Sequence, residues 1–344
     1  MSGGWSNEKR CTVENAFYAF LGRAFVNSKD RGRICLGQNL YQGQIDLITE
    51  IFDALEEDIH RVYVLKSRQL GISTLIRALI IFLLGIHRGL KGAIVFDSDS
   101  NRIEARAEVE TMIGDLPSSL KFPDVKSTNR QGLTLKNDSK VLFMSAGVKK
   151  TKISGVLGRS IGLSLAHLSE LCSWDNPEGL EAFENSLSDE NPDRLYIYES
   201  TARGYNSWWN IWREARADPL HCKCVFLGFW SKQSQRIDPD HMDFHVYGVQ
   251  PPTEKELEKI KQVRELYGYE VTQPQIAWIR RRMDPAAGQE GDGDEKTEYT
   301  GSAERIQEQP WTEEDAFQQT GAIFFAAKDL KDLTDNFASK KARS

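Results

Sequence analysis

The chain has 344 residues, of which 40% are hydrophobic and 27% charged, and its formal net charge is −6. This balance is typical of a folded protein with a sizeable core, and it excludes a uniformly basic coat for nucleic-acid binding. No run of about 18 apolar residues and no apolar leader segment occur, so we expect a cytoplasmic protein without a membrane span.

Residues 1–37 mix polar and aromatic side chains, and we predict an N-terminal lid or partner-contact segment there. An amphipathic helix is predicted to follow and to end at about Leu55. Three glutamines, Gln38, Gln42 and Gln44, lie near its start. A glutamine amide can offer a donor and an acceptor to an adenine edge, although a lone glutamine is usually a solvated surface residue.

Residues 61–74 predict a strand, a loop and a helix in direct succession. The segment 62–65 is rich in β-branched residues, Gly71 lies in a polar loop, and an apolar run with helical character occupies 75–84. In this order, backbone N–H groups of the loop and the positive end of the helix dipole can face an anion. The segment therefore predicts a phosphate cradle, with an ordinary strand-to-helix turn as the alternative.

The loop at 66–74 reads KSRQLGIST, which matches the standard phosphate-loop pattern only in part. In the frame that places Gly71 at the second glycine, Ile72 stands where a lysine is expected, and Ser73 fills the hydroxyl position. Lys66 stands at the first-glycine position. We therefore predict that the phosphate-binding cation has moved to the start of the loop.

A second apolar strand is predicted at 92–97, followed by a helix to about Ile113. Strands that alternate with helices indicate an α/β fold with a parallel sheet and ligands at the carboxyl ends of its strands. Arg102 and Arg106 lie on this helix. They are candidates for an arginine finger, and ordinary surface arginines are the alternative.

A hairpin is predicted at 133–144, because apolar alternation flanks an Asn-Asp turn. Lys149, Lys150 and Lys152 follow as a dense positive cluster. A contact to the DNA backbone and a solvated loop are equally compatible with this cluster.

Residues 161–170 form an apolar run that ends in Glu170. ATP hydrolysis needs a carboxylate at such a strand end to polarise the attacking water. Ser169 stands where an aspartate commonly precedes this acid, which makes it a doubtful metal ligand. Ser73, with waters and ATP oxygens, would then carry more of the Mg²⁺ coordination.

Residues 195–204, LYIYESTARG, predict a further core strand that ends in Ser200 and Thr201 and is followed by Arg203. A His-Cys-Lys-Cys cluster at 221–224 has residue types found in metal sites. The apolar run directly after it favours a core strand with buried thiols, and the five cysteines, odd in number and scattered, argue against a disulfide framework.

The loop at 66–74 resembles the deviant Walker A loop of tailed-bacteriophage large terminases, the ATPases that pump DNA into a preformed capsid. In that family a lysine at the start of the loop replaces the usual one, and an arginine inside the loop contacts the phosphates. Lys66 and Arg68 match these positions. The pattern Leu-Tyr-x-x-Gln also resembles the adenine-recognition motif of this family, with Gln44 at the matching position.

The acid motif and the third strand extend the resemblance. His-Leu-Ser-Glu followed by Trp174 resembles a variant acid motif of terminases, and Ser-Thr-Ala resembles their coupling motif, with Arg203 where asparagine is common. The resemblance implies catalytic roles for Glu170, Lys66 and Arg68, nucleotide contacts from Gln44, Gln69, Gly71, Ile72, Ser73 and Thr74, and coupling by Ser200 and Thr201. The candidates for DNA contacts are the three lysines of the positive cluster, Lys149, Lys150 and Lys152, and Arg203 after the third strand.

This resemblance spans about residues 36–325. It implies a RecA-like P-loop ATPase core with a mostly parallel sheet at 38–250, a linker subdomain at 251–325 and a C-terminal tail at 326–344. It also implies ATP and Mg²⁺ as cofactors, and double-stranded DNA, a small terminase subunit and the portal protein of the procapsid as partners. We expect a host-cytoplasmic monomer that assembles into a homo-oligomeric ring. The alternatives are another helicase-group translocase and a non-hydrolysing nucleotide-binding scaffold.

Charged helices are predicted at 254–266 and 275–282, and the acidic run at 290–295 follows in a stretch poor in apolar residues. A two-metal nuclease needs carboxylates that converge from strand ends, and no strand pattern fixes these acids. We therefore expect that this chain lacks the terminase nuclease domain and hydrolyses ATP without cleaving DNA.

Overall fold

The computed structural model describes residues 5–28, 31–146, 162–174, 177–202, 204–284 and 306–317. The chain divides into two units, the first made of Met1–Thr201 and Asn210–Ser234 and the second of Ala202–Trp209 and Gln235–Ser344. The acidic run at 290–295 lies outside the described residues.

An eight-stranded sheet organises the first unit, with strand order β10-β3-β9-β8-β4-β7-β6-β5. The strands are β3 (Arg61–Lys66), β4 (Lys91–Phe96), β5 (Val125–Asn129), β6 (Gly132–Leu135), β7 (Lys140–Ser145), β8 (Leu165–Ser169), β9 (Leu195–Ser200) and β10 (Cys222–Leu227). All neighbouring pairs from β10 to β7 are parallel, and β7, β6 and β5 pair antiparallel. The predicted α/β fold with a mostly parallel sheet is confirmed.

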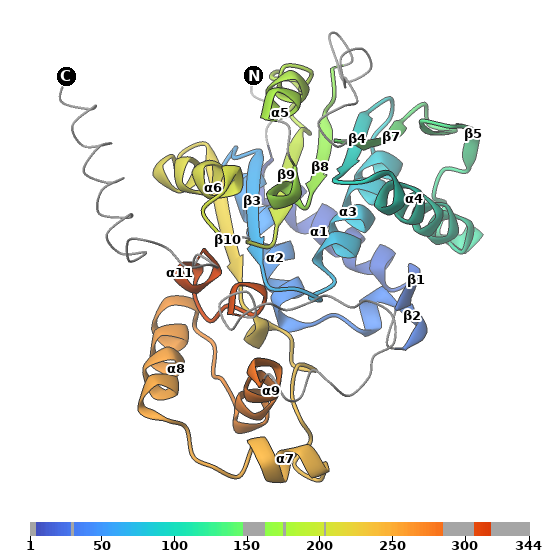
Figure 1. Ribbon diagram of the computed structural model, residues 1–344. Coiled ribbons are helices and arrows are strands. Elements are labelled where there is room, and N and C mark those ends of the chain that lie inside the picture. Colours follow the sequence, from blue (N-terminus) through green and yellow to red (C-terminus); the bar gives the residue numbers. More distant parts are fainter. Residues whose placement is uncertain are drawn as a thin grey trace, which may run out of the picture. The chain divides into compact units, whose positions relative to one another are not determined.

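The strand that precedes the 66–71 loop and the strand that delivers Glu170 are not neighbours. β9 lies between β3 and β8, and Figure 1 shows β10, β3, β9, β8 and β4 in sequence across the sheet. Because all these strands are parallel, their carboxyl ends meet at one edge. That edge brings together three motifs that are far apart in the sequence.

Four helices share one apolar core with the sheet: α1 (Asn7–Leu21), α2 (Gln42–Glu56), α3 (Ile72–Ile86) and α4 (Asp99–Gly114). Nearly all the side chains of α3 from Leu75 to Leu84 are buried. A helix that is apolar all round belongs inside a protein, and here it packs against the central strands β8 and β4. The hairpin of β1 (Phe25–Ser28) and β2 (Gly32–Cys35) is separate from the large sheet.

Aromatic rings fix α1 to the neighbouring helices. Phe17 lies 5.2 Å from Phe82 of α3 and 6.4 Å from Phe52 of α2, measured between ring centroids. Phe20 also contacts Phe82, at 5.5 Å. Both α1 rings are buried, so the segment interpreted from its sequence as a lid contributes to the core of this unit.

Phe17→Ala is expected to lower the free energy of unfolding by about 3–5 kcal/mol, because it removes a fully buried ring and leaves a cavity between three helices. Urea denaturation followed by circular dichroism measures this change. Ile103→Ala on α4 is the control, since Ile103 is 58% exposed and its loss should cost less than about 0.5 kcal/mol. Equal losses in the two variants would contradict the packing of α1.

The other face of the sheet carries stacked tyrosines. The rings of Tyr63 on β3 and Tyr198 on β9 lie 4.6 Å apart and nearly parallel. The Tyr198 hydroxyl donates a hydrogen bond to Glu184 Oε1, at 3.0 Å, on α5 (Pro177–Glu184). Phe183 of the same helix is buried, so α5 covers this face.

The cysteines at 222 and 224 lie in a strand, β10, as predicted, but β10 is the outermost strand of the sheet and both thiols are half-buried, so the prediction of buried thiols is wrong for this pair. Cys222 and Cys224 pair in register with Arg61 and Tyr63 of β3, and all five cysteines are free thiols. Among the described residues no group of three or more His, Cys, Asp or Glu side chains could hold a metal ion. No helix in the described part of the chain is long and apolar enough to cross a membrane.

The second unit contains short helices joined by polar contacts: α7 (Met242–Tyr247), α8 (Glu254–Tyr267), α9 (Gln273–Met283) and α11 (Glu313–Ala316), while α6 (Ser207–Ala217) is divided between the two units. The predicted helices at 254–266 and 275–282 are confirmed as α8 and α9. Arg280 of α9 binds both carboxylate oxygens of Glu256, at 2.8 and 2.7 Å. Trp209 and Phe317 also pack, with ring centroids 4.7 Å apart.

Candidate active site

The loop after β3 has the backbone of a tight turn. Gly71 forms the N-cap of α3 with φ of 67°, in the left-handed region that favours glycine. A Cβ atom at this position would lie 2.9 Å from Gln44 Nε2. Helix α3 begins at Ile72, so Ser73 and Thr74 occupy its first turn and the predicted helix start at residue 75 was three residues late. The first N–H groups of a helix have no acceptor within the helix and can bind an anion, so the geometry agrees with the predicted phosphate cradle, and phosphate binding stays a prediction.

Lys66 is the last residue of β3 and is almost fully buried. Its Nζ atom lies 3.0 Å from Glu170 Oε1 and 4.0 Å from Glu199 Oε1. Burial lowers the pKa of the Lys66 ammonium, but the two carboxylates raise it further and hold it above its ordinary value. The lysine at the start of the loop is therefore protonated and faces the predicted catalytic acid.

Glu170 follows β8 directly and has φ of 56°, an uncommon backbone conformation for a residue with a side chain. Its Oε1 atom accepts a hydrogen bond from Lys66, and its Oε2 atom accepts one from Thr201 Oγ1 at 3.3 Å. The side chain is 30% exposed. It can therefore reach solvent while Lys66 and Thr201 hold both of its oxygens.

The predicted coupling residues lie beside this acid. Ser200 and Thr201 are buried at the end of β9, and Ser200 Oγ accepts a hydrogen bond from the backbone N–H of Cys172 at 2.9 Å. Thr201 contacts the Glu170 carboxylate itself. The structure thus connects these hydroxyls to the segment that carries the acid, and their coupling role stays a prediction.

Glu199 of β9 is a buried carboxylate that the sequence analysis did not assign to the site. Its Oε1 atom accepts hydrogen bonds from Ser73 Oγ at 2.6 Å and from Ser169 Oγ at 2.9 Å. Burial raises the pKa of Glu199, but the neighbouring Lys66 ammonium and the hydrogen bond from Ser73 lower it more, so the pKa lies below its ordinary value and the carboxylate is ionised. The available signal was a charged residue inside an otherwise apolar strand.

His167 lies two residues before Ser169 on β8 and is fully buried. Its Nε2 atom is 3.9 Å from Glu199 Oε1. Burial lowers the pKa of His167, more strongly than Glu199 raises it. The imidazole is therefore neutral at neutral pH, and Lys66 supplies the positive charge that contacts Glu170.

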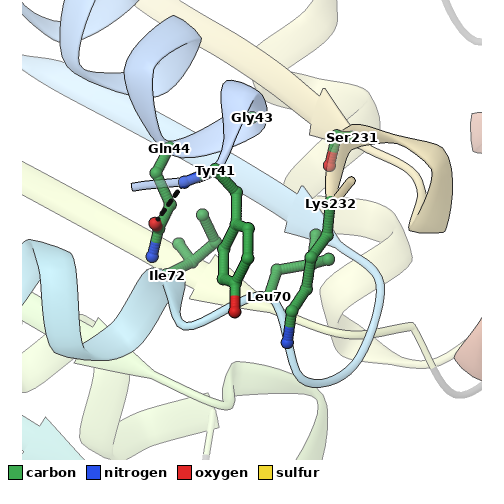
Figure 2. Close-up of a pocket in the computed structure, with 7 residues that line it drawn as sticks. All are labelled: Tyr41, Gly43, Gln44, Leu70, Ile72, Ser231 and Lys232. Carbon is green, nitrogen blue, oxygen red and sulfur yellow. Dashed lines mark hydrogen bonds between the residues drawn. The ribbon is translucent and has the colours of Figure 1, made fainter. Parts of the chain in front are cut away.

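A pocket lies beside the loop (Figure 2), lined by Tyr41, Gly43, Gln44, Leu70, Ile72, Ser231 and Lys232. The Gln44 amide makes contacts at both ends: Oε1 accepts from the Tyr41 N–H at 3.0 Å, and Nε2 donates to the Gly71 carbonyl at 3.1 Å. Gln44 therefore caps α2 and positions the loop, and its adenine contact stays a prediction. Its competitor Gln42 donates to Asp46 Oδ1 at 2.8 Å, and Gln38 ends the short helix Leu36–Gln38.

Lys232 is a second residue that no sequence motif indicated. Its Nζ atom donates to the carbonyl of Gln69 at 2.8 Å and lies 4.7 Å from the centroid of the Tyr41 ring. The contact with Tyr41 is a cation–π interaction. Together the two contacts join the loop to the edge of the pocket. Gln69 itself is exposed, with φ of 61°.

The remaining predicted residues are less central in the described structure. Thr74 Oγ1 donates to Glu108 Oε1 at 3.2 Å and accepts from Arg77, so its hydroxyl faces α4. Arg68 is half-buried in the loop. The arginine-finger candidates make local contacts, Arg102 to Asp99 and Arg106 to Glu110 and the carbonyl of Asn129. The DNA-contact candidates Lys149, Lys150, Lys152 and Arg203 lie outside the described residues.

Comparison with solved structures finds matches, whereas no protein-family model and no curated protein matches the chain. The HK97 bacteriophage large terminase matches with 15% identity and a TM-score of 0.49, over 77% of this chain and 54% of that one. The chain is similar to phage large terminases. It spans about half the length of the HK97 protein.

Two other phage terminases match at similar levels. The ATPase domain of the Thermus phage P74-26 large terminase has 16% identity and a TM-score of 0.45, over 72% of this chain and 99% of that one. The large terminase of another thermophilic bacteriophage, in complex with ATP-gamma-S, has 9% identity and a TM-score of 0.44, over 62% and 50% of the two chains. At these identities the likeness concerns the fold alone.

The side chains at the carboxyl edge of the sheet fit a magnesium ion. Mg²⁺ prefers oxygen ligands, and the hydroxyl of Ser73 and the carboxylate of Glu199 lie in contact there. Glu199 Oε2 is buried and has no hydrogen-bond partner among the described residues. An unpartnered carboxylate oxygen next to a hydroxyl at the first turn of a helix is a suitable place for a cation.

Proposed function

We propose that this chain is the ATPase motor portion of a phage large terminase, which hydrolyses ATP and drives double-stranded DNA into a procapsid. The observation that carries the proposal is the contact of a buried lysine, Lys66, with an acid at a strand end, Glu170, beside the N-terminus of α3. This arrangement provides a phosphate cradle, a fixed positive charge and a carboxylate at one edge of the sheet. The terminase resemblance of the three motifs adds the biological context.

In this proposal the residues of the loop bind the phosphates. The N–H groups at the start of α3 and the Lys66 ammonium donate hydrogen bonds to phosphate oxygens, and Arg68 adds a second positive charge. Mg²⁺ bound with ATP, with Ser73 as its predicted ligand, neutralises charge on the phosphates. When the phosphates bind, the Lys66 ammonium would exchange its hydrogen bond to Glu170 for hydrogen bonds to phosphate oxygens.

Glu170, once released from Lys66, can act as the general base. Its carboxylate accepts a proton from the attacking water, whose oxygen forms the new bond to the γ-phosphorus as the bond to the leaving ADP oxygen breaks. Thr201 donates a hydrogen bond to the same carboxylate, so a change in the charge or position of Glu170 would change this contact at the end of β9. This contact gives the proposed coupling motif a physical link to the chemistry.

The partners of the motor are part of the same proposal. Double-stranded DNA would contact a local basic patch, for which Lys149, Lys150, Lys152 and Arg203 are the candidates, because the net charge of the chain is −6. A small terminase subunit and the portal protein would complete the packaging assembly. A ring of several copies would let neighbouring chains supply an arginine in trans, as arginine fingers do in other ATPases.

ATP turnover measured with and without nucleic acid tests this function. We expect slow basal turnover that double-stranded DNA accelerates, while RNA and single-stranded DNA have less effect. Stronger stimulation by RNA or single strands would favour a helicase-group translocase. Nucleotide binding without turnover under any of these conditions would favour a non-hydrolysing scaffold.

A further inference from the structure

Glu199 lies in one row of side chains that crosses three parallel strands. It is in register with Val64 on β3 and with Ser169 on β8. Residues in register on parallel strands point to the same face of a sheet, and neighbouring strands are about 4.8 Å apart. Ser169 occupies the position where an acid commonly holds the metal, so a carboxylate lies one strand away from that position.

The side chain of Glu199 bridges this strand spacing. Its Oε1 atom accepts hydrogen bonds from the hydroxyls of both Ser169 and Ser73, at 2.9 and 2.6 Å. A hydroxyl that donates its proton to a carboxylate keeps its lone pairs available for a cation. In P-loop ATPases the metal is held by the loop hydroxyl together with an acid from the sheet. The contact between Ser73 and Glu199 reproduces this pair of groups with an acid from a different strand.

The state of the second oxygen of Glu199 is evidence for a bound ligand. Glu199 is 0% exposed, and its Oε2 atom has no hydrogen-bond partner among the described residues. Buried polar atoms without partners are rare, and each calls for an ordered water, an ion or a functional role. Its nearest positive charge, Lys66 Nζ, lies 4.0 Å from Oε1 and is already bound to Glu170.

We propose that Glu199 is the carboxylate that holds the metal ion of the bound nucleotide, directly or through one of its waters, in place of the aspartate that Ser169 replaces. This inference rests on the proposed function. It assigns Ser169 a positioning role, because the Ser169 hydroxyl fixes the rotamer of Glu199. The alternative is that Glu199 only supports the loop by its hydrogen bond to Ser73.

Titration calorimetry of ADP, in excess Mg²⁺ and in EDTA, separates these roles. Glu199→Gln keeps the shape and the acceptor for Ser73 but removes the charge. A metal-holding role predicts that the gain in ADP affinity caused by Mg²⁺ falls about 10- to 100-fold. In EDTA the variant should bind ADP as well as the parent or more tightly, because a negative charge near the phosphates is gone.

A supporting role alone gives the opposite pattern. Because the amide still accepts the hydrogen bond from Ser73, the variant would then keep the full Mg²⁺ gain, with its ADP affinity unchanged or weakened by the same factor with Mg²⁺ and with EDTA. Full retention of the Mg²⁺ gain would overturn the inference. If the parent chain itself does not bind ADP, the proposed function fails, and with it the inference.

Two further variants sharpen the test. Glu184→Gln is the control. Glu184 of α5 accepts a hydrogen bond from Tyr198, which is on the same strand as Glu199, but the Glu184 carboxylate lies outside the site. This variant should leave the ADP affinity unchanged both with Mg²⁺ and with EDTA. The double variant Ser169→Asp/Glu199→Gln returns an acid to the common position. It should recover the Mg²⁺ gain, and a melting curve of each unliganded variant shows that the fold is retained.

Discussion

Replacing Lys66 with alanine is expected to lower ATP turnover about 100- to 1,000-fold, the usual cost of removing one preorganised charge donor from a transition state. Ile72 occupies the standard lysine position of the loop, so the charge that other P-loops place there must come from elsewhere. The Lys66 ammonium is buried at the end of β3, and neighbouring carboxylates raise its pKa. Single-turnover hydrolysis of radiolabelled ATP measures the effect.

Lys126→Ala is the matched control for this variant. Lys126 is an exposed lysine on β5 that pairs with Asp138, and its removal should leave turnover unchanged. The Lys66 variant also leaves buried carboxylates with fewer partners, so its rate must be expressed per folded molecule from a circular dichroism melt. A folded Lys66 variant with turnover within about twofold of the parent would contradict the relocated cation.

Glu170→Gln should retain nucleotide binding and lose hydrolysis by about 100- to 10,000-fold, the range of general-base contributions. The amide keeps the size of the side chain, and its single oxygen can still accept a hydrogen bond from Lys66 or from Thr201, although not from both in their present positions. It cannot accept a proton from water. Fluorescence anisotropy of a labelled ATP and steady-state phosphate release measure binding and hydrolysis separately.

Glu181→Gln, on the exposed side of α5, is the control for the loss of one carboxylate. It should bind and hydrolyse ATP as the parent does. If Glu170→Gln abolishes nucleotide binding while the control does not, Glu170 has a structural role, and the general base lies elsewhere.

Local patterns were sufficient to predict the strands and helices around the site. The segments 61–66, 91–96 and 195–200 are mostly apolar, with their charged and hydroxyl residues at or near the ends, which is typical of buried parallel strands. The start of α3 was predicted three residues late, because the pattern of apolar residues begins at Leu75. The backbone of Gly71, which has positive φ and caps the helix, determines the true start.

Contacts between distant segments could not be predicted in the same way. Ser73 and Glu199 are 126 positions apart, and their hydrogen bond depends on β9 lying next to β3. Lys232 reaches the loop from 163 positions away, and it belongs to no motif. The adenine role predicted for Gln44 relied on residue type and on the resemblance of the Leu-Tyr-x-x-Gln pattern to a terminase motif, whereas the structure shows that the packing of α2 against the loop engages both ends of its amide.

The order of the strands has a consequence for how the chain is made. Strand β3, the second in the order of the sheet, ends at Lys66, but both of its partners, β9 and β10, are synthesised more than a hundred residues later, with β10 ending at Leu227. Until β9 has left the ribosome, both edges of β3 are unpaired, and one edge stays unpaired until β10 follows, so α3 has no complete sheet to cover it. Such long-range pairing is slow and leaves apolar surface exposed during synthesis. The carboxyl edge of this sheet, where Lys66, Glu170 and Glu199 meet, can therefore form only late in translation, and nascent chains of this protein should depend on chaperones until then.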